Sequence, residues 1–72
     1  MSDPMQYPES DPRHHTMKIK GMLDALTDHL REDVGKVSDP KAQALFETSA
    51  EVLTGLKAAY QHFEQRQERA WR

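Results

Sequence analysis

The sequence predicts an all-α fold, an antiparallel hairpin of two helices. In two long segments the apolar residues recur every three to four positions, which is the period of a helix with one buried face. Each segment is preceded by the tripeptide Ser-Asp-Pro, at 10–12 and at 38–40. No segment alternates apolar and polar residues with a period of two, so we expect no strand.

The Ser-Asp-Pro tripeptides predict where the helices begin. An aspartate before the first turn accepts a hydrogen bond from an unpaired backbone N–H, and proline suits the first helical position because no N–H is needed there. A further copy at 2–4 is followed closely by Pro8, which prevents a helix from continuing. We therefore expect residues 1–11 to form a flexible N-terminal arm.

The first helix is expected over residues 12–34. One of its faces carries the apolar residues Ile19, Met22, Leu23, Leu26 and Leu30. Gly35 follows as a C-terminal cap, and the turn 35–39 is short enough to return the chain antiparallel.

The second helix is expected over residues 40–68. Its apolar face carries Ala42, Leu45, Phe46, Ser49, Val52, Leu53, Leu56, Ala59, Tyr60 and Phe63. Two helices cannot cover both stripes completely, so we expect a homodimer in which two hairpins form a four-helix bundle. A row of small residues from Ala44 to His62 leaves a tetramer as the alternative.

The expected core of this oligomer combines both stripes. It consists of Ile19, Met22, Leu26, Leu30, Leu45, Phe46, Ser49, Leu53, Leu56, Tyr60 and Phe63. Leu26→Asp or Leu53→Asp is then expected to abolish both folding and association.

Three polar residues continue the stripe of the first helix and are candidate metal ligands: His15, His29 and Asp33. His29 and Asp33 are one turn apart and could hold one divalent ion. His15 lies about 21 Å away along the axis, so it could join them only across a dimer interface. The structural interpretation is that His29 lies at the edge of the bundle and hydrogen-bonds to Asp33 or to a neighbouring chain. His15 is expected near Phe63, Glu64 and Gln67, whereas the adjacent His14 is expected to face solvent.

Composition excludes several functional classes. The 72 residues contain no cysteine and have a formal net charge of −2, with the two signs interspersed. A basic surface for nucleic acid and a membrane-spanning apolar run are both missing. No nucleophile or phosphate-binding motif indicates an enzyme. We therefore expect a non-enzymatic, cytoplasmic structural or protein-interaction module without a cofactor, with a metal-binding bundle as the alternative.

Overall fold

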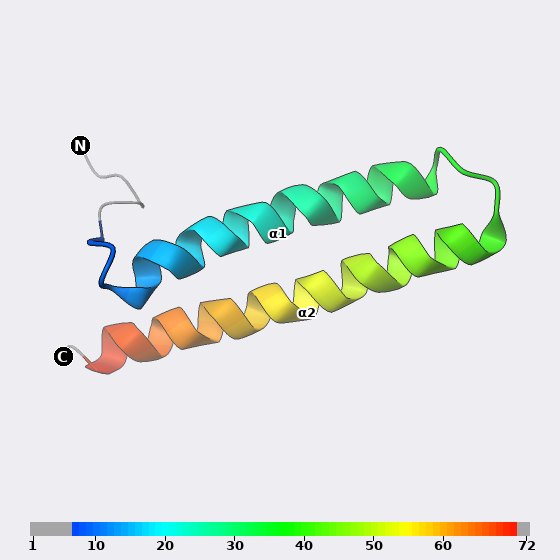
Figure 1. Cartoon of the computed structure of the whole chain (residues 1–72). Coiled ribbons are helices and arrows are strands. Elements are labelled where there is room, and N and C mark those ends of the chain that lie inside the picture. Colours follow the sequence, from blue (N-terminus) through cyan, green and yellow to red (C-terminus); the bar gives the residue numbers. More distant parts are fainter. Residues whose placement is uncertain (1–6, 71–72) are drawn as a thin grey trace.

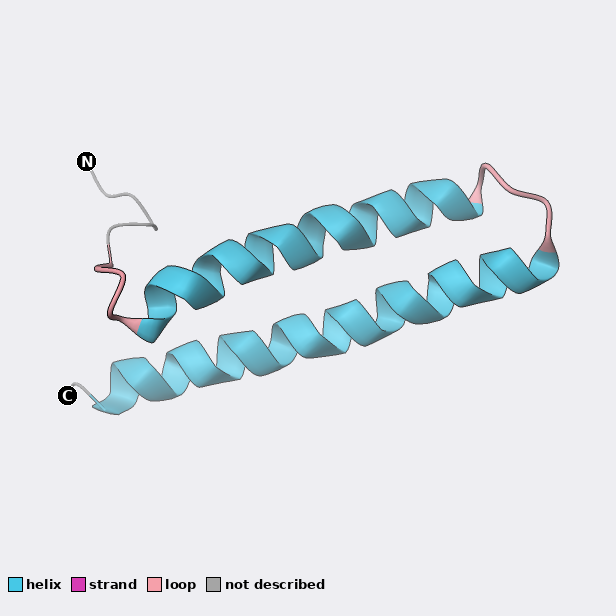
Figure 2. Ribbon diagram, viewed as in Figure 1, coloured by secondary structure: helices cyan, strands magenta, loops and turns pink. Residues whose placement is uncertain are grey.

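The computed structural model describes the backbone of residues 7–70 and the side chains of residues 7–66. It is a hairpin of two antiparallel helices, α1 (Pro12–Val34) and α2 (Pro40–Ala70) (Figure 1). No strand occurs in the described part of the chain (Figure 2). The predicted all-α hairpin is confirmed, and α2 continues slightly beyond the expected end at residue 68. Residues 1–6 of the predicted arm lie outside the described residues.

The two helices begin as the Ser-Asp-Pro tripeptides predict. Asp11 has extended backbone angles, and its carboxylate accepts a hydrogen bond from the backbone N–H of Arg13 at 2.9 Å. Asp39 accepts in the same way from the backbone N–H of Lys41, also at 2.9 Å. The Arg13 guanidinium donates further hydrogen bonds to Asp11, and these, with the backbone bond, lower the pKa of the Asp11 carboxyl.

The connection between the helices is closed by hydrogen bonds rather than by unusual backbone angles. The Gly35 N–H donates to the carbonyl of Glu32 at 3.1 Å, and its φ of −78° is available to any residue. The side-chain amide of Gln43 donates to the Val37 carbonyl at 2.7 Å and so ties α2 to the connection. Gly35 thus lies at the predicted cap position without using the conformational freedom of glycine.

The two helices pack along a single seam, defined here by those half-buried and buried residues that recur with a regular spacing. In α1 they are Thr16, Lys20, Leu23, Thr27, Leu30 and Val34, and in α2 they are Gln43, Phe46, Ala50, Leu53, Lys57, Tyr60 and Glu64. Their spacing alternates between three and four residues, which is the repeat of a coiled coil. The most buried residues are the small Thr27 and Ala50, at 8% and 3% exposure. Small side chains there allow the helices to approach closely.

The predicted stripe on α1 lies only partly in the seam. Leu23 and Leu30 are in the seam and Ile19 is half-buried, whereas Met22 and Leu26, expected in the core, are 68% and 48% exposed within the hairpin. Thr27, which was not in the predicted stripe, is buried, and it tolerates burial because its hydroxyl donates to the Leu23 carbonyl at 2.7 Å. On α2, Phe46 and Leu53 lie in the seam as expected. The remaining expected core residues of α2 divide between the seam and the surface.

The hairpin is long and thin, with extents of 50 × 23 × 17 Å. Its radius of gyration is 15.6 Å, whereas a compact domain of this length has about 11 Å. The chain exposes 5590 Å², compared with about 4600 Å² for a compact monomer of its mass. A single layer of two helices therefore leaves about 1000 Å² more surface in water than is usual.

Candidate functional site

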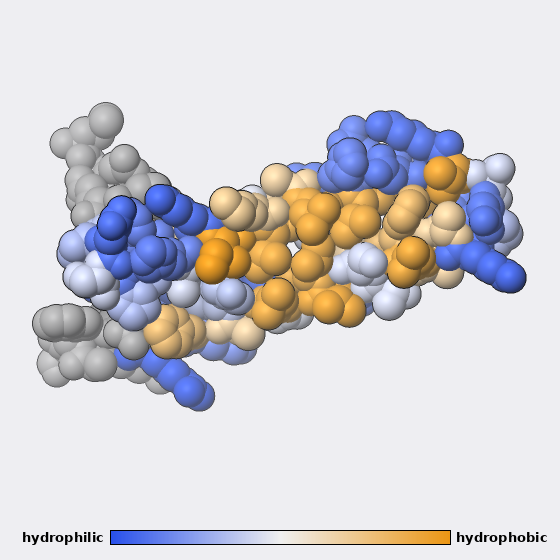
Figure 3. Space-filling model, viewed as in Figure 1, coloured by the Kyte–Doolittle hydropathy of each residue, from blue (hydrophilic) through white to orange (hydrophobic). Residues whose placement is uncertain are grey.

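Six large apolar side chains of the described residues remain exposed outside the seam. They are Met22 and Leu26 on α1 and Leu45, Val52, Leu56 and Phe63 on α2, and we call them the open face. Figure 3 shows the apolar surface running over the middle of both helices. Scattered exposed apolar residues are common on proteins, but a continuous band of them usually marks an interaction surface.

The open face is continuous because of its register relative to the seam. Each of its residues comes immediately before a seam residue, as Met22 precedes Leu23 and Leu56 precedes Lys57. One position along a helix is a rotation of about 100°. Since the helices are antiparallel, this rotation turns both rows toward the same side of the hairpin. The two rows therefore form one surface.

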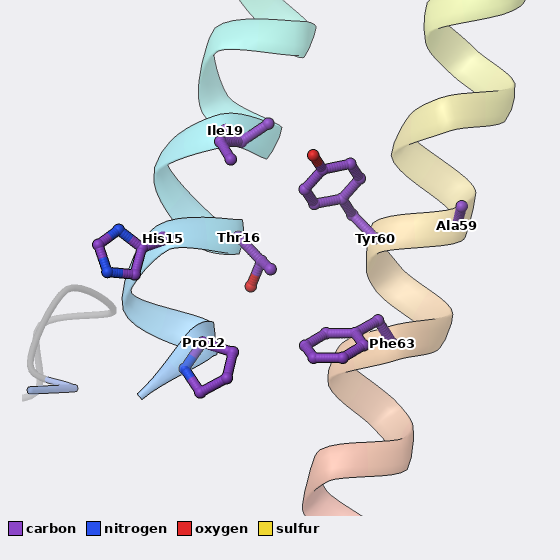
Figure 4. A pocket seen from close by; sticks show the side chains of 7 residues that line it. All are labelled: Pro12, His15, Thr16, Ile19, Ala59, Tyr60 and Phe63. Atoms are coloured by element: carbon purple, nitrogen blue, oxygen red, sulfur yellow. The ribbon is translucent and has the colours of Figure 1, made fainter. Parts of the chain in front are cut away.

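A shallow pocket of about 500 Å³ lies at the end of the open face where α1 begins. It is lined by Pro12, His15, Thr16, Ile19, Ala59, Tyr60 and Phe63. The rings of Tyr60 and Phe63 extend toward α1, while the methyl group of Ala59 leaves space beside them (Figure 4). The lining is mainly apolar, so the pocket suits an apolar side chain better than a charged group.

The polar groups beside the pocket are already hydrogen-bonded within the hairpin. The Glu64 carboxylate accepts from the Thr16 hydroxyl at 2.6 Å and forms an ion pair with Lys20. Glu64 therefore does not serve as the acceptor for His15, as the sequence suggested. Nε2 of His15 instead donates to the backbone carbonyl of Glu9 at 2.7 Å, because a carbonyl can only accept. His15 does share the pocket with Phe63, and the expected Gln67 side chain lies outside the described residues.

His14 is more covered than His15, which reverses the expected difference between them. Its Nδ1 donates to the backbone carbonyl of Tyr7 at 2.7 Å, and it is half-buried, whereas His15 is exposed. The Arg13 guanidinium lies 4.2 Å from the centre of the Tyr7 ring. Both histidines thus hold the segment before α1 against its first turn. Sequence periodicity could not predict this role because that segment is not helical.

The candidate metal ligands fall at opposite ends of α1. His29 Nε2 lies 3.1 Å from a carboxylate oxygen of Asp33, and Lys36 is 3.8 Å from the other oxygen. His15 lies near the opposite end of the helix, about 21 Å from His29. Within the described residues, no three histidine or carboxylate side chains gather where they could hold one ion. The contact between His29 and Asp33 favours the structural interpretation of these two residues.

Two ion pairs along the seam connect the helices, and we call their four residues, Lys20, Asp24, Lys57 and Glu64, the charged flank. Lys57 Nζ lies 2.7 Å from a carboxylate oxygen of Asp24, and Lys20 pairs with Glu64, so both ion pairs join α1 to α2. The aliphatic parts of the two lysines cover the edge of the seam. The hydrophobic pattern did not predict these seam positions, because lysine is usually a surface residue. The regular seven-residue spacing through Lys20 and Lys57 is the signal that could have revealed it.

Neither described helix combines the length and the apolar character needed to cross a lipid bilayer. No protein-family model, no curated protein and no solved structure matches the chain. The function must therefore be inferred from the open face itself.

Proposed function

We propose that this chain is a non-enzymatic structural module that acts by self-association. A second copy covers the open face, and the two hairpins form a four-helix bundle that serves as a scaffold or an interaction platform. A cytoplasmic location, which the cysteine-free composition suggests, is part of this proposal.

The observation that carries the proposal is the exposure of large apolar side chains on one side only. Val52 and Leu45 are 63% and 61% exposed, values expected of charged residues rather than of aliphatic ones. The hairpin exposes about 1000 Å² more than a compact monomer, and a standard dimer interface takes about 800 Å² from each partner. One interface of ordinary size thus accounts for the excess surface.

A second copy is the simplest partner because the excess disappears when two hairpins pair. A compact chain of twice this length has a radius of gyration of about 14–15 Å, close to the 15.6 Å of one hairpin. The elongated hairpin therefore has dimensions expected of one half of a compact dimer rather than of a compact monomer.

The test is the mass of the full chain in solution. Sedimentation equilibrium at tens of micromolar should give about twice the chain mass of 8.3 kDa. Val52→Asp places a carboxylate on the open face and should yield a monomer. Thr48→Asp is the matched control: Thr48 is also β-branched and exposed, but it lies on the outer side of α2. This variant should remain a dimer.

Circular dichroism of each variant separates loss of association from loss of folding. The proposal fails if the unmodified chain is a fully helical monomer at these concentrations. It also fails if Val52→Asp and Thr48→Asp weaken association equally, since the open face would then have no special role.

A further inference from the structure

We infer that the two copies pair with their connections, residues 35–39, at opposite ends of the bundle. In this arrangement α1 lies against α1 of the second copy, and α2 against α2. Leu45 of each copy then enters the pocket of the other, and Asp33 of each meets His15 of the other. This inference rests on the proposed self-association and specifies its geometry.

The open face has a hollow end and a projecting end. The pocket of about 500 Å³ lies where α1 begins, beside Phe63 and His15. Leu45, at 61% exposure, projects from the other end, near the connection. If the connections were at the same end, α1 would lie on α2 of the other copy. The two pockets would then face each other, and each Leu45 would lie against the polar end of the other α1, near Asp33. Reversing one copy places each projection against a hollow, which interior packing density requires.

The polar residues at the two ends of the open face select the same orientation. His15 and Asp33 continue the α1 row of the open face toward the two ends of the helix, at equal distances from the midpoint between Met22 and Leu26. Pairing in the same direction would bring two Asp33 carboxylates into one layer, where like charges repel each other. Pairing in opposite directions gives each end layer one Asp33 and one His15, so no two carboxylates share a layer.

The centre of the face is apolar in this arrangement. Met22 of one copy lies level with Leu26 of the other, and Val52 lies level with Leu56 of the other. The next layer outward combines the small Ser49 and Ala59 with larger side chains of α1. The face therefore has an apolar middle and polar ends, which is the usual composition of a specific interface.

The first test measures the distance between the two connections. The chain has no cysteine, so Ser38→Cys introduces a single site for a nitroxide label. Ser38 is exposed in the connection. Pulsed dipolar spectroscopy should give about 40 Å or more between the labels, since the connections are separated by the length of the 23-residue helix α1. Connections at the same end would give about 25 Å or less.

A second label position separates failure of this inference from failure of the proposed function. Ala25→Cys lies near the middle of α1 and is exposed, so its labels couple in either orientation of a dimer. Coupling at residue 25 with a short distance at residue 38 would overturn the orientation and leave self-association intact. The absence of coupling at both positions would overturn self-association itself.

The second test uses the inferred pair of Asp33 in one copy and His15 in the other. His15→Asp alone should weaken dimerisation about tenfold, because it sets two carboxylates together. Adding Asp33→His restores an opposite pair, and the double variant should recover to within about threefold of the unmodified affinity. Residues 15 and 33 are about 27 Å apart along one helix, so their coupling can arise only between copies. Additive effects of the two substitutions would contradict the pairing of these residues.

Discussion

The charged flank and the open face border the same seam and differ in the chemistry of their side chains. On the charged flank, Lys57 and Lys20 join α1 to α2 through the carboxylates of Asp24 and Glu64. On the open face, aliphatic side chains such as Val52 meet water with no polar covering. Both flanks are built on the same two helices, so the difference comes from residue choice alone. The charged groups are therefore paired within one chain, whereas the open face is left uncovered by the described residues.

The difference also separates two kinds of stabilisation. The charged flank holds the two helices of one chain together, since each of its ion pairs connects α1 with α2. A largely exposed ion pair such as Lys57–Asp24 contributes only about 0.2–1 kcal/mol, so most of the stability of the hairpin comes from its seam. In the proposed dimer, the open face adds stability through its burial by the second copy, and that contribution depends on protein concentration.

The largest expected effect comes from placing the same charge on the seam and on the open face. Leu53→Asp puts a carboxylate in the seam and should cost about 4 kcal/mol, which is comparable with the whole stability of a small domain. Leu26→Asp, on the open face, should leave the hairpin helical and prevent dimerisation. Circular dichroism and sedimentation measured on both variants check this. Equal loss of helicity would show that seam and open face form one indivisible core.

The sequence alone could not predict that Leu53 lies in the seam and Leu26 on the open face. Both residues fit an apolar stripe with a spacing of three and four, so periodicity assigned them to one core. A helix with apolar residues over a wide arc has two possible seams, one position apart. The choice between them depends on side chains such as Thr27, Lys20 and Lys57, which pack in spite of their polar groups. Tertiary contacts decide this, whereas a hydrophobic pattern does not.

The helix limits were easier to predict because local chemistry determines them. The Asp-Pro pairs at 11–12 and 39–40 satisfy the first-turn N–H groups without help from distant residues. The pocket was harder, since it needs Ala59 and Ile19 at one level of two antiparallel helices. Its depth depends on the relative stagger of α1 and α2, which is set by the seam.

A smaller effect is expected on the charged flank. Glu64→Ala removes the acceptor of the Thr16 hydroxyl and the partner of Lys20, and it should destabilise the hairpin by about 2 kcal/mol. The Lys20 and Glu64 side chains are only 20% and 15% exposed, so solvent replaces this interaction poorly. Urea denaturation monitored by circular dichroism measures the change. Gln65→Ala, at the exposed neighbouring position, is the control and should stay within about 0.5 kcal/mol of the unmodified protein.

The two histidines should have similar effects on hairpin stability but different effects on association. Each donates one hydrogen bond to a backbone carbonyl, so His14→Ala and His15→Ala should each cost about 0.5–1 kcal/mol. Only His15 lines the pocket of the open face, so only His15→Ala should weaken the dimer. Denaturation and sedimentation of both variants provide the comparison. Weaker association in both variants would instead place the whole beginning of α1 at the interface.

The smallest effect is expected at the beginning of α1, outside both flanks, and depends on pH. Hydrogen bonds from the Arg13 side chain, followed by the bond from its backbone N–H, lower the pKa of Asp11 in the folded chain. A carboxyl whose pKa is lower in the folded state than in the unfolded state contributes stability above the unfolded value of 3.8. This contribution disappears as the pH falls through the folded value.

Asp11→Asn keeps an oxygen that can cap the helix but removes the titration. The unmodified protein should therefore be more stable than Asp11→Asn at pH 7, and the difference should shrink as the pH is lowered to 3. Thermal denaturation at the two pH values measures it. In an Arg13→Gln background the pH dependence of the difference should become smaller, because the main cause of the lowered pKa is gone. A difference that grows on acidification would contradict this, because it would mean that folding favours the protonated form of Asp11. The mass in solution should stay the same throughout, since Asp11 lies at the end of α1 and is not part of the open face.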